Sequence, residues 1–345
     1  MHPDHAYHIS QGCPSDPVRN LLSQNNQEVL VISALTQPLR QSQGTIVILT
    51  LLVLTLLLTI IVEFAYSVYV GTNLLYNYRD GQRLSLLASS GVELAIKYLQ
   101  DYIRTVKYTT FNATTLPVGP IASAYDAATE GNDNLVISVT DENARFNVNT
   151  LISQNGKTNE FALTCFKRLL KRLDINQDIA YYVADWIDPD TEERYTNIEP
   201  GGAAPAEQDT KNANLFSTDE LRQIKKLTPD VYKKLLPYIT VHGDGLININ
   251  TAEPPVLYCL SEDIDENLAS AVVEFRKKTP FSITSDIQNV PGMQHVGKTL
   301  IGRIEVKSDT FSITSEASNA NIVKDVVATA IIGGSKETIL YWKEF

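Results

Sequence analysis

The fold of this chain depends on residues 43–62, which read QGTIVILTLLVLTLLLTIIV. Residues 45–62 of this stretch carry no charge and are mostly apolar, and no proline occurs between Pro38 and Pro117. At about 1.5 Å per residue, such a run forms a helix of about 27 Å, long enough to cross the hydrocarbon core of a bilayer. We therefore predict a transmembrane segment over 45–62 that continues as one long helix over 45–108.

The helical pattern changes beyond the apolar run. From Tyr66 to Tyr108, apolar residues recur mostly at spacings of three and four, with polar residues between them. A helix that is apolar all round at first and then keeps a single apolar stripe suits an element that leaves lipid and packs on a folded domain. Gly71, Gly81 and Gly91 each cost about 1 kcal/mol relative to alanine, which favours local bending.

Composition limits the function classes. The 345 residues leave room for two domains beyond the helix, and the net charge is -11, nearly all of it carried beyond residue 44. A strongly acidic body argues against nucleic acid as a partner and fits an extracytoplasmic surface. The five histidines are scattered, and the sequence lacks a nucleophile elbow or a phosphate-binding loop, so we do not expect an enzyme.

Alternating apolar residues predict strands on both sides of a helical block, with residues 109–134 as a loop between the long helix and the first strand. This arrangement predicts an α+β fold in which the helix packs on an antiparallel sheet interrupted by an inserted helical domain. The predicted strands are 135–139, 144–150, 238–241, 245–251, 304–306, 311–313, 326–332 and 338–342.

The inserted segment contains an internal repeat. NVNT at 147–150 returns as NINT at 248–251, and residues 175–186 match residues 264–275 at most apolar positions. We expect two helical modules of common design, with Thr150 and Thr251 each capping the helical segment after its motif. Between them, Ser217 to Glu220 has the spacing of a capping box. Thr228-Pro229 opens another helix, with proline in its first turn.

Gly44 before an apolar helix, followed by GVELA at 91–95, resembles the type IV pilin and pseudopilin class. Within it, the sequence is most similar to the K family of type II secretion minor pseudopilins. The resemblance implies cleavage by prepilin peptidase between Gly44 and Thr45. It also implies one pass through the inner membrane, a periplasmic body, and partners among the I- and J-type minor pseudopilins and the inner-membrane secretion platform.

Leu49 supports the K family within that class. Most pilins have a glutamate at this fifth mature position, and the K family lacks it. A carboxylate in hydrocarbon costs about 2.5–3.5 kcal/mol and needs a partner, which in pilins is the amino terminus of the neighbouring subunit. A subunit at the filament tip has no subunit above it to neutralise, so it does not need this carboxylate. A plain anchor would explain the apolar run but not the glycine before it, and a secretory signal would need a small-residue cleavage site, which is missing.

The resemblance covers nearly all of residues 44–345 and orders the predicted domains. The two helical modules resemble helix-hairpin-helix or SAM-like folds. The domains are the leader (1–44), the helix (45–108), the first part of the pilin-like domain (109–150), the first module (151–237), a strand segment (238–251), the second module (252–300) and the C-terminal pilin-like strands (301–345).

An acidic phrase at 185–193, DWIDPDTEE, is the candidate metal site. Alternating carboxylates in a turn suit Ca²⁺, which takes six to eight oxygens. The alternative is that Asp188 caps a helix end and the rest is a solvated loop. The phrase resembles the calcium loop of the K family, and this resemblance implies a ligand set of Asp188, Asp190, Glu193, Glu207 and Asp209.

Two further features leave alternatives open. Cys165 and Cys259 could form a disulfide in an oxidising compartment or remain two buried free thiols. The second module also resembles DNA-binding helix-hairpin-helix proteins, but its hairpin, LSEDIDE at 260–266, has no glycine and four carboxylates that would repel phosphate. A membrane-anchored DNA-binding protein and a type IV pilus tip subunit are the alternative functions.

Overall fold

The computed structural model describes residues 42–110, 113–116, 133–189, 210–224, 226–333 and 337–345. It divides into two compact units, one up to Leu74 and one from Leu75 to Phe345. Helix α2 (Ser42–Thr105) contributes to both, and its bounds lie three residues earlier than the predicted 45–108.

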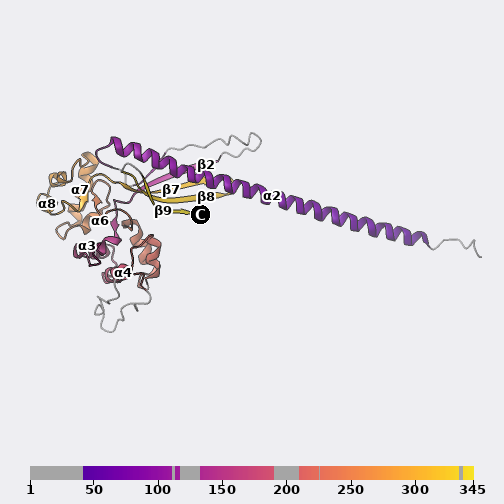
Figure 1. Cartoon of the computed structure of the whole chain (residues 1–345), viewed down its shortest axis with the longest axis horizontal. Coiled ribbons are helices and arrows are strands. Elements are labelled where there is room, and N and C mark those ends of the chain that lie inside the picture. Colours follow the sequence, from indigo (N-terminus) through magenta and orange to yellow (C-terminus); the bar gives the residue numbers. More distant parts are fainter. Residues whose placement is uncertain (1–41, 111–112, 117–132, 190–209, 225, 334–336) are drawn as a thin grey trace, which may run out of the picture. The chain divides into compact units, whose positions relative to one another are not determined.

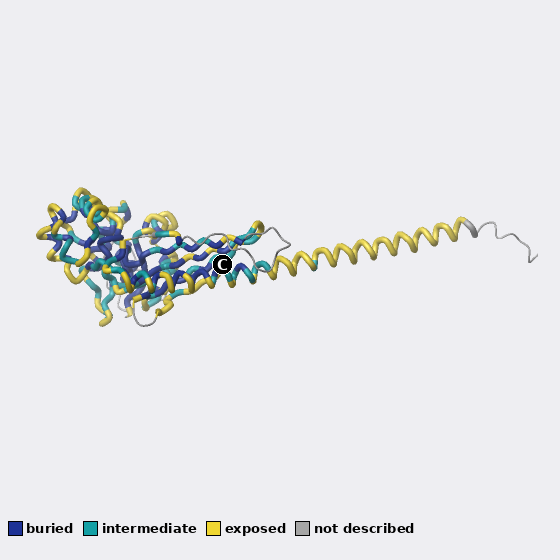
Figure 2. The backbone as a smooth tube through the Cα atoms, turned by 90° about the horizontal axis from the view of Figure 1, so that it is seen from above, coloured by how far each residue is buried: buried dark blue, intermediate teal, exposed yellow. Residues whose placement is uncertain are grey.

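The described residues of the first unit all belong to α2. Every side chain described from Gly44 to Val70 is exposed, as the colouring of Figure 2 shows. Among the residues that the structure describes, α2 is the one helix whose length and apolar composition would allow it to cross a membrane. Apolar side chains exposed over such a length are stable only in an apolar environment.

The second unit contains an antiparallel sheet of five strands, in the order β1-β2-β7-β8-β9 (Figure 1). Residues of α2 from Leu84 to Ile103 pack against this sheet and form one buried cluster with residues such as Ile137 and Ile313. The predicted long apolar helix and antiparallel sheet are therefore confirmed. The strands are β1 (Ala113–Leu116), β2 (Asn134–Asp141), β7 (Thr310–Ser318), β8 (Val323–Ile331) and β9 (Thr338–Glu344).

Gly91 is the glycine of α2 that lies closest to the sheet. A Cβ atom at this position would overlap the Ser315 side chain and crowd Leu135, whereas Gly71 and Gly81 have open space around them. Of the four glycines in this helix, only Gly91 has a packing reason, because Gly44 likewise has nothing within 4 Å of an added Cβ in the described part of the chain.

Between β2 and β7 the chain forms two successive runs of helices, each with its own hydrophobic core. Each run begins and ends with a two-residue strand, and the two strands pair in parallel. The first run comprises β3 (Phe146–Asn147), η1 (Val148–Leu151), α3 (Glu160–Arg172), α4 (Ile179–Ile187), η3 (Thr218–Gln223), α5 (Pro229–Leu235), η4 (Leu236–Tyr238) and β4 (Ile239–Thr240). The second comprises β5 (Ile247–Asn248), α6 (Pro254–Cys259), α7 (Glu266–Lys278), η5 (Thr284–Asn289), α8 (Val296–Thr299) and β6 (Ile304–Glu305).

Three local predictions were wrong. The loop predicted over 109–134 contains strand β1, which pairs with β2. The strands predicted over 144–150 and 245–251 end at Asn147 and Asn248, because each of these asparagine side chains accepts a hydrogen bond from the N–H two residues further on. Thr150 and Thr251 are not N-caps, since the next helices are preceded by Asn159 and Glu253.

The two predicted helix starts between the modules are confirmed. Ser217 and Glu220 form a capping box, although the helix they open is the 3₁₀ helix η3. Thr228 caps α5, which has Pro229 in its first turn.

Candidate functional site

The two Asn-x-Asn-Thr motifs have the same hydrogen-bonding pattern. In each, the side chain of the first asparagine accepts a hydrogen bond from the N–H of the second, at 3.0 Å for Asn147 and 2.9 Å for Asn248. The threonine hydroxyl lies back over the carbonyl of the first asparagine: Thr150 donates to it at 2.6 Å, and the Thr251 oxygen is 3.3 Å from it, although the stronger acceptor of the Thr251 hydroxyl is the Asp141 carboxylate at 2.7 Å. Each motif is therefore a closed turn, which explains why its strand is so short.

The side chain of the second asparagine in each motif forms hydrogen bonds with the backbone of two segments that are distant in the sequence. Asn149 accepts from the Leu215 N–H at 2.8 Å and donates to the carbonyls of Leu215 and Val241. Asn250 accepts from the Phe281 N–H at 2.8 Å and donates to the Phe281 carbonyl and to the carbonyl of Val306.

The segments held by these asparagines also correspond. After Leu215, the Glu220 carboxylate accepts from the Phe216 and Ser217 N–H groups. After Phe281, the Asp286 carboxylate accepts in the same way from the N–H groups of the next two residues. The two runs are thus a tandem repeat in detail, from the first strand to the last.

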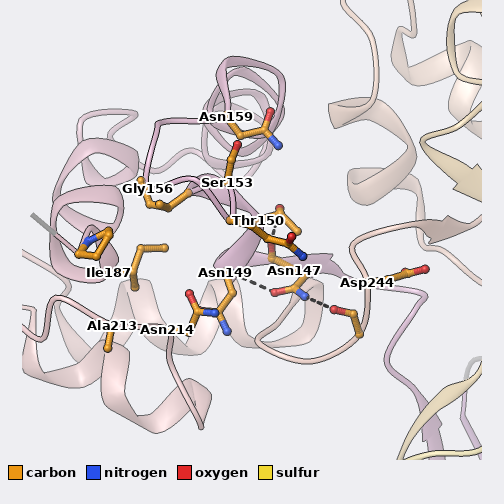
Figure 3. Close-up of a pocket in the computed structure, with 14 residues that line it drawn as sticks. Asn147, Asn149, Thr150, Ser153, Gly156, Asn159, Ile187, Ala213, Asn214 and Asp244 are labelled. Carbon is orange, nitrogen blue, oxygen red and sulfur yellow. Dashed lines mark hydrogen bonds between the residues drawn. The ribbon is translucent and has the colours of Figure 1, made fainter.

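A cavity of 460 Å³ adjoins the first motif (Figure 3). Asn147, Asn149, Asn214 and Asp244 line it, together with residues on either side of Asp188. The Asn147 amide donates to the carbonyls of His242 and Gly243, so the motif's asparagines are already used in holding the fold. Amide and hydroxyl side chains make up most of its polar lining, and among the described residues Asp244 is its one carboxylate.

Asp141 joins the sheet to the second motif. Its carboxylate is fully buried at the end of β2 and accepts hydrogen bonds from the hydroxyls of Thr251 (2.7 Å) and Ser308 (2.6 Å) and from the Asn143 N–H (2.9 Å). Burial raises the pKa of Asp141 to about 7, because the loss of hydration outweighs the hydrogen bonds that favour the charged form.

Glu305 on β6 lies in the same acidic junction. Burial, together with the smaller effect of the nearby charges of Asp244, Asp309 and Asp141, raises its pKa to about 9, although Asn143 donates to its carboxylate at 2.6 Å. Sequence analysis missed this junction. The phrase DEN at 141–143 looks like an ordinary turn, and nothing local indicates that its first residue is buried.

Of the predicted metal ligands, only Asp188 lies among the described residues. It is 3 % exposed, stands at the C-terminal cap of α4, and donates its N–H to the Ala184 carbonyl at 3.0 Å. Asp190, Glu193, Glu207 and Asp209 lie outside the described residues. Within the described ranges, no group of three histidine, cysteine or acidic side chains is close enough to hold a metal ion.

Cys165 on α3 and Cys259 on α6 are buried free thiols in one hydrophobic cluster. Burial, and then the hydrogen-bonding interaction with the neighbouring Cys165 thiol, which favours the protonated form, raise the pKa of Cys259 above its ordinary value. The two thiols are thus neighbours across the two modules, and their oxidation to a disulfide stays a prediction.

The acidic hairpin of the second module faces the first module. Glu266 pairs with Arg172 at 2.6 Å, and Glu262 lies 3.8 Å from Arg168. Both arginines belong to α3, so two carboxylates of the hairpin are directed at protein cations.

Comparison with known proteins gives consistent matches. Two family models, both described as type II secretion system (T2SS) protein K, match residues 144–244 and 247–307. These ranges coincide with the two structural repeats, and each contains one Asn-x-Asn-Thr motif.

Curated relatives carry the same description. The type II secretion system protein K of Pseudomonas aeruginosa is 30% identical over 161 residues, which cover 44% of this chain and 47% of that protein. The protein K of Pectobacterium carotovorum is 25% identical over 296 residues, covering 79% of this chain and 87% of the relative. The matched region thus spans about half the length of the Pseudomonas relative.

A solved structure has a similar fold. A chain in the crystal structure of the GspK-GspI-GspJ complex from enterotoxigenic Escherichia coli superposes with a TM-score of 0.57 at 17% identity. The superposition covers 78% of this chain and 98% of that chain.

The long apolar helix, which could cross a membrane, the antiparallel sheet packed on its second part and the doubled helical module together define the class of fold. The two family models and the relatives agree on one family: over the matched residues the chain is similar to the type II secretion system protein K family.

Proposed function

We propose that this chain is the minor pseudopilin of the K type in a type II secretion system, with a structural rather than a catalytic role. The observation that carries the proposal is the change in exposure along α2. Its side chains are exposed and mostly apolar from Ile46 to Val62, and from Leu84 to Ile103 one stripe of the same helix is buried against the sheet. A single helix thus provides both a membrane segment and the support of a folded domain.

In this proposal, prepilin peptidase cuts between Gly44 and Thr45, at the start of α2. The mature chain spans the inner membrane once and holds its body in the periplasm. Leu49, 62 % exposed, stands where a repeating pilin subunit would need a carboxylate. We infer that the chain initiates the filament at its tip, since it brings no buried charge that a further subunit must neutralise.

Partners of the I and J types, and the inner-membrane platform that assembles the filament, belong to the same proposal. The related E. coli chain was solved together with GspI and GspJ, which supports partners of this kind. The segment between β2 and β7 acts as an inserted helical domain of two helix-hairpin-helix-like modules. This domain crowns the tip.

We also propose a calcium site that includes Asp188. A buried carboxylate at the end of α4 suits a hard cation, which Ca²⁺ is. The remaining proposed ligands, Asp190, Glu193, Glu207 and Asp209, would complete it from the next segment of the chain. Melting of the purified chain in rising Ca²⁺ tests the site, because a ligand that binds only the folded state raises the melting temperature. A melting temperature that stays constant up to millimolar Ca²⁺ would remove the calcium proposal, and Asp188→Asn should abolish any shift.

The DNA-binding alternative is disfavoured by the geometry of the second module. The hairpin that would have to face phosphate is acidic, and two of its carboxylates lie against arginines of α3. A tip subunit of a type IV pilus would share the architecture, and the genes beside this one would distinguish the two systems.

Secretion provides the test of the proposed function. Deleting the gene should stop export of the secreted proteins while they accumulate in the periplasm, and the wild-type chain should restore export. A variant with Gly44→Val should remain as the unprocessed precursor and fail to restore it. Normal export without the chain would refute the proposed function.

A further inference from the structure

Strand β9 has one free side. It pairs with β8 along Thr338–Glu344, and it is the last strand of the five in the sheet. In the part of the chain that the structure describes, no strand pairs with its other edge. A free strand edge presents a row of unpaired backbone N–H and C=O groups, which is a template for another strand.

The side chains of this edge are unusually apolar. Ile339 is 50 % exposed, Leu340 39 % and Trp342 38 %, and Phe345 directly after the strand is 57 % exposed. Proteins usually protect such an edge with lysine, proline or a covering element. Here the charged residues of the strand are confined to its end, at Lys343 and Glu344.

The position of β9 indicates what pairs with it. Ser85 donates to Glu344 at 3.2 Å and Gln100 donates to Glu337 at 2.6 Å, so the strand runs beside α2 over this whole stretch. The same stretch of α2 exposes Leu86, which is 71 % accessible. The free edge therefore continues the helix surface along which, under the proposed function, neighbouring subunits pack.

We propose that β9 is a pairing edge for a β-strand from the sheet of a partner minor pseudopilin. This inference rests on the proposed function, and it adds a defined contact to it. Backbone hydrogen bonds along β9 would supply the affinity, and the exposed Ile339 and Trp342 side chains would select the partner strand. A strand is the occupant that satisfies the unpaired backbone groups, which a helix or a lipid tail cannot do.

Site-specific photo-crosslinking in cells tests the contact directly. A photoreactive amino acid replaces Ile339 in the full-length chain, and, as the matched control, Val323 on β8. Val323 is equally exposed at 56 % but lies beyond Val326, where the pairing with β9 ends. The position 339 adduct should contain a peptide from a sheet strand of an I- or J-type partner, and the position 323 variant should give no such adduct. An adduct between two copies of this chain, an adduct with lipid alone, or no adduct would overturn the proposal.

A charge variant provides the second measurement. Ile339→Lys should reduce co-purification of the partner at least tenfold at an unchanged melting temperature, and Val323→Lys should not reduce it. If the wild type and Ile339→Lys retain the partner equally, the pairing edge is refuted and the proposed function stands. If the wild-type chain itself retains no minor pseudopilin, the proposed function fails first. Should Ile339→Lys not fold, the crosslinking result decides.

Discussion

Replacing the buried Asp141 by asparagine should stabilise the folded domain at neutral pH and leave it nearly unchanged in acid. The pKa of Asp141 rises from 3.8 to about 7 on folding, because burial disfavours its charged form. The folded state therefore retains a proton that the unfolded chain releases above about pH 4. The contribution of this group to stability is complete below the unfolded pKa and is lost as the pH rises through 7.

The magnitude is set by the size of the shift. Each pKa unit corresponds to about 1.4 kcal/mol, so about 4 kcal/mol is lost between pH 4 and pH 7. Asparagine is the uncharged isostere of the protonated acid. Its amide can donate to the hydroxyls of Thr251 and Ser308, which now donate to the carboxylate, while its oxygen keeps the Asn143 N–H. Asp141→Asn should accordingly match the wild type at pH 4 and exceed its stability by up to about 4 kcal/mol at pH 7.5.

Urea unfolding of residues 75–345, which form one compact unit, measures this difference through tryptophan fluorescence. The free energy of unfolding is compared at several pH values, with Asp101→Asn, an exposed change on α2, as the matched control. The control should keep the wild-type slope. Parallel pH profiles for the wild type and Asp141→Asn would refute the reasoning, since they would mean that Asp141 is equally ionised in both states.

Three further predictions concern the packing and the repeat. Gly91→Ala should destabilise the domain by about 1–3 kcal/mol, because the added methyl group overlaps the sheet. Gly81→Ala, at a position with open space around it, should stabilise the domain by about 1 kcal/mol. Thermal melts compare the two variants, and equal shifts in melting temperature would contradict the close contact at Gly91. Asn250→Ala should cost about 3 kcal/mol in urea unfolding, because it removes the partner of the Phe281 N–H and C=O and one of the two donors to the Val306 carbonyl, which keeps the Thr109 N–H. A loss below about 1 kcal/mol would contradict its role in holding these two segments together. In protein exported to an oxidising compartment, Cys165 and Cys259 should form a disulfide and therefore resist alkylation after denaturation until a reductant is added. An intact mass that shows two alkylated thiols without reductant would contradict this prediction.

Periodicity along the sequence was sufficient for the long elements. The apolar run and the spacing of three and four defined α2, and alternation located β2, β8 and β9 to within three residues. For β7 it found only the first part, 311–313 of Thr310–Ser318. The internal repeat was visible because each motif returns with the same residue types. Strand β1, ATTL at 113–116, was missed because its composition matches that of the surrounding loop.

The contacts that join distant segments were beyond local reasoning. Asp141 meets Thr251 and Ser308 across 110 and 167 residues, and no pattern near any of the three indicates the others. The roles of Asn149 and Asn250 likewise depend on loops brought back by the fold. Sequence analysis placed these asparagines in a motif but read the motif as part of a strand.

The identity of the first residue of the chain in the membrane tests the central claim most directly. N-terminal sequencing and intact mass of the protein purified from membranes should show a chain that begins at Thr45, with the first 44 residues removed. A membrane-embedded chain that still carries these residues would show that α2 is a simple anchor and would contradict the pseudopilin account.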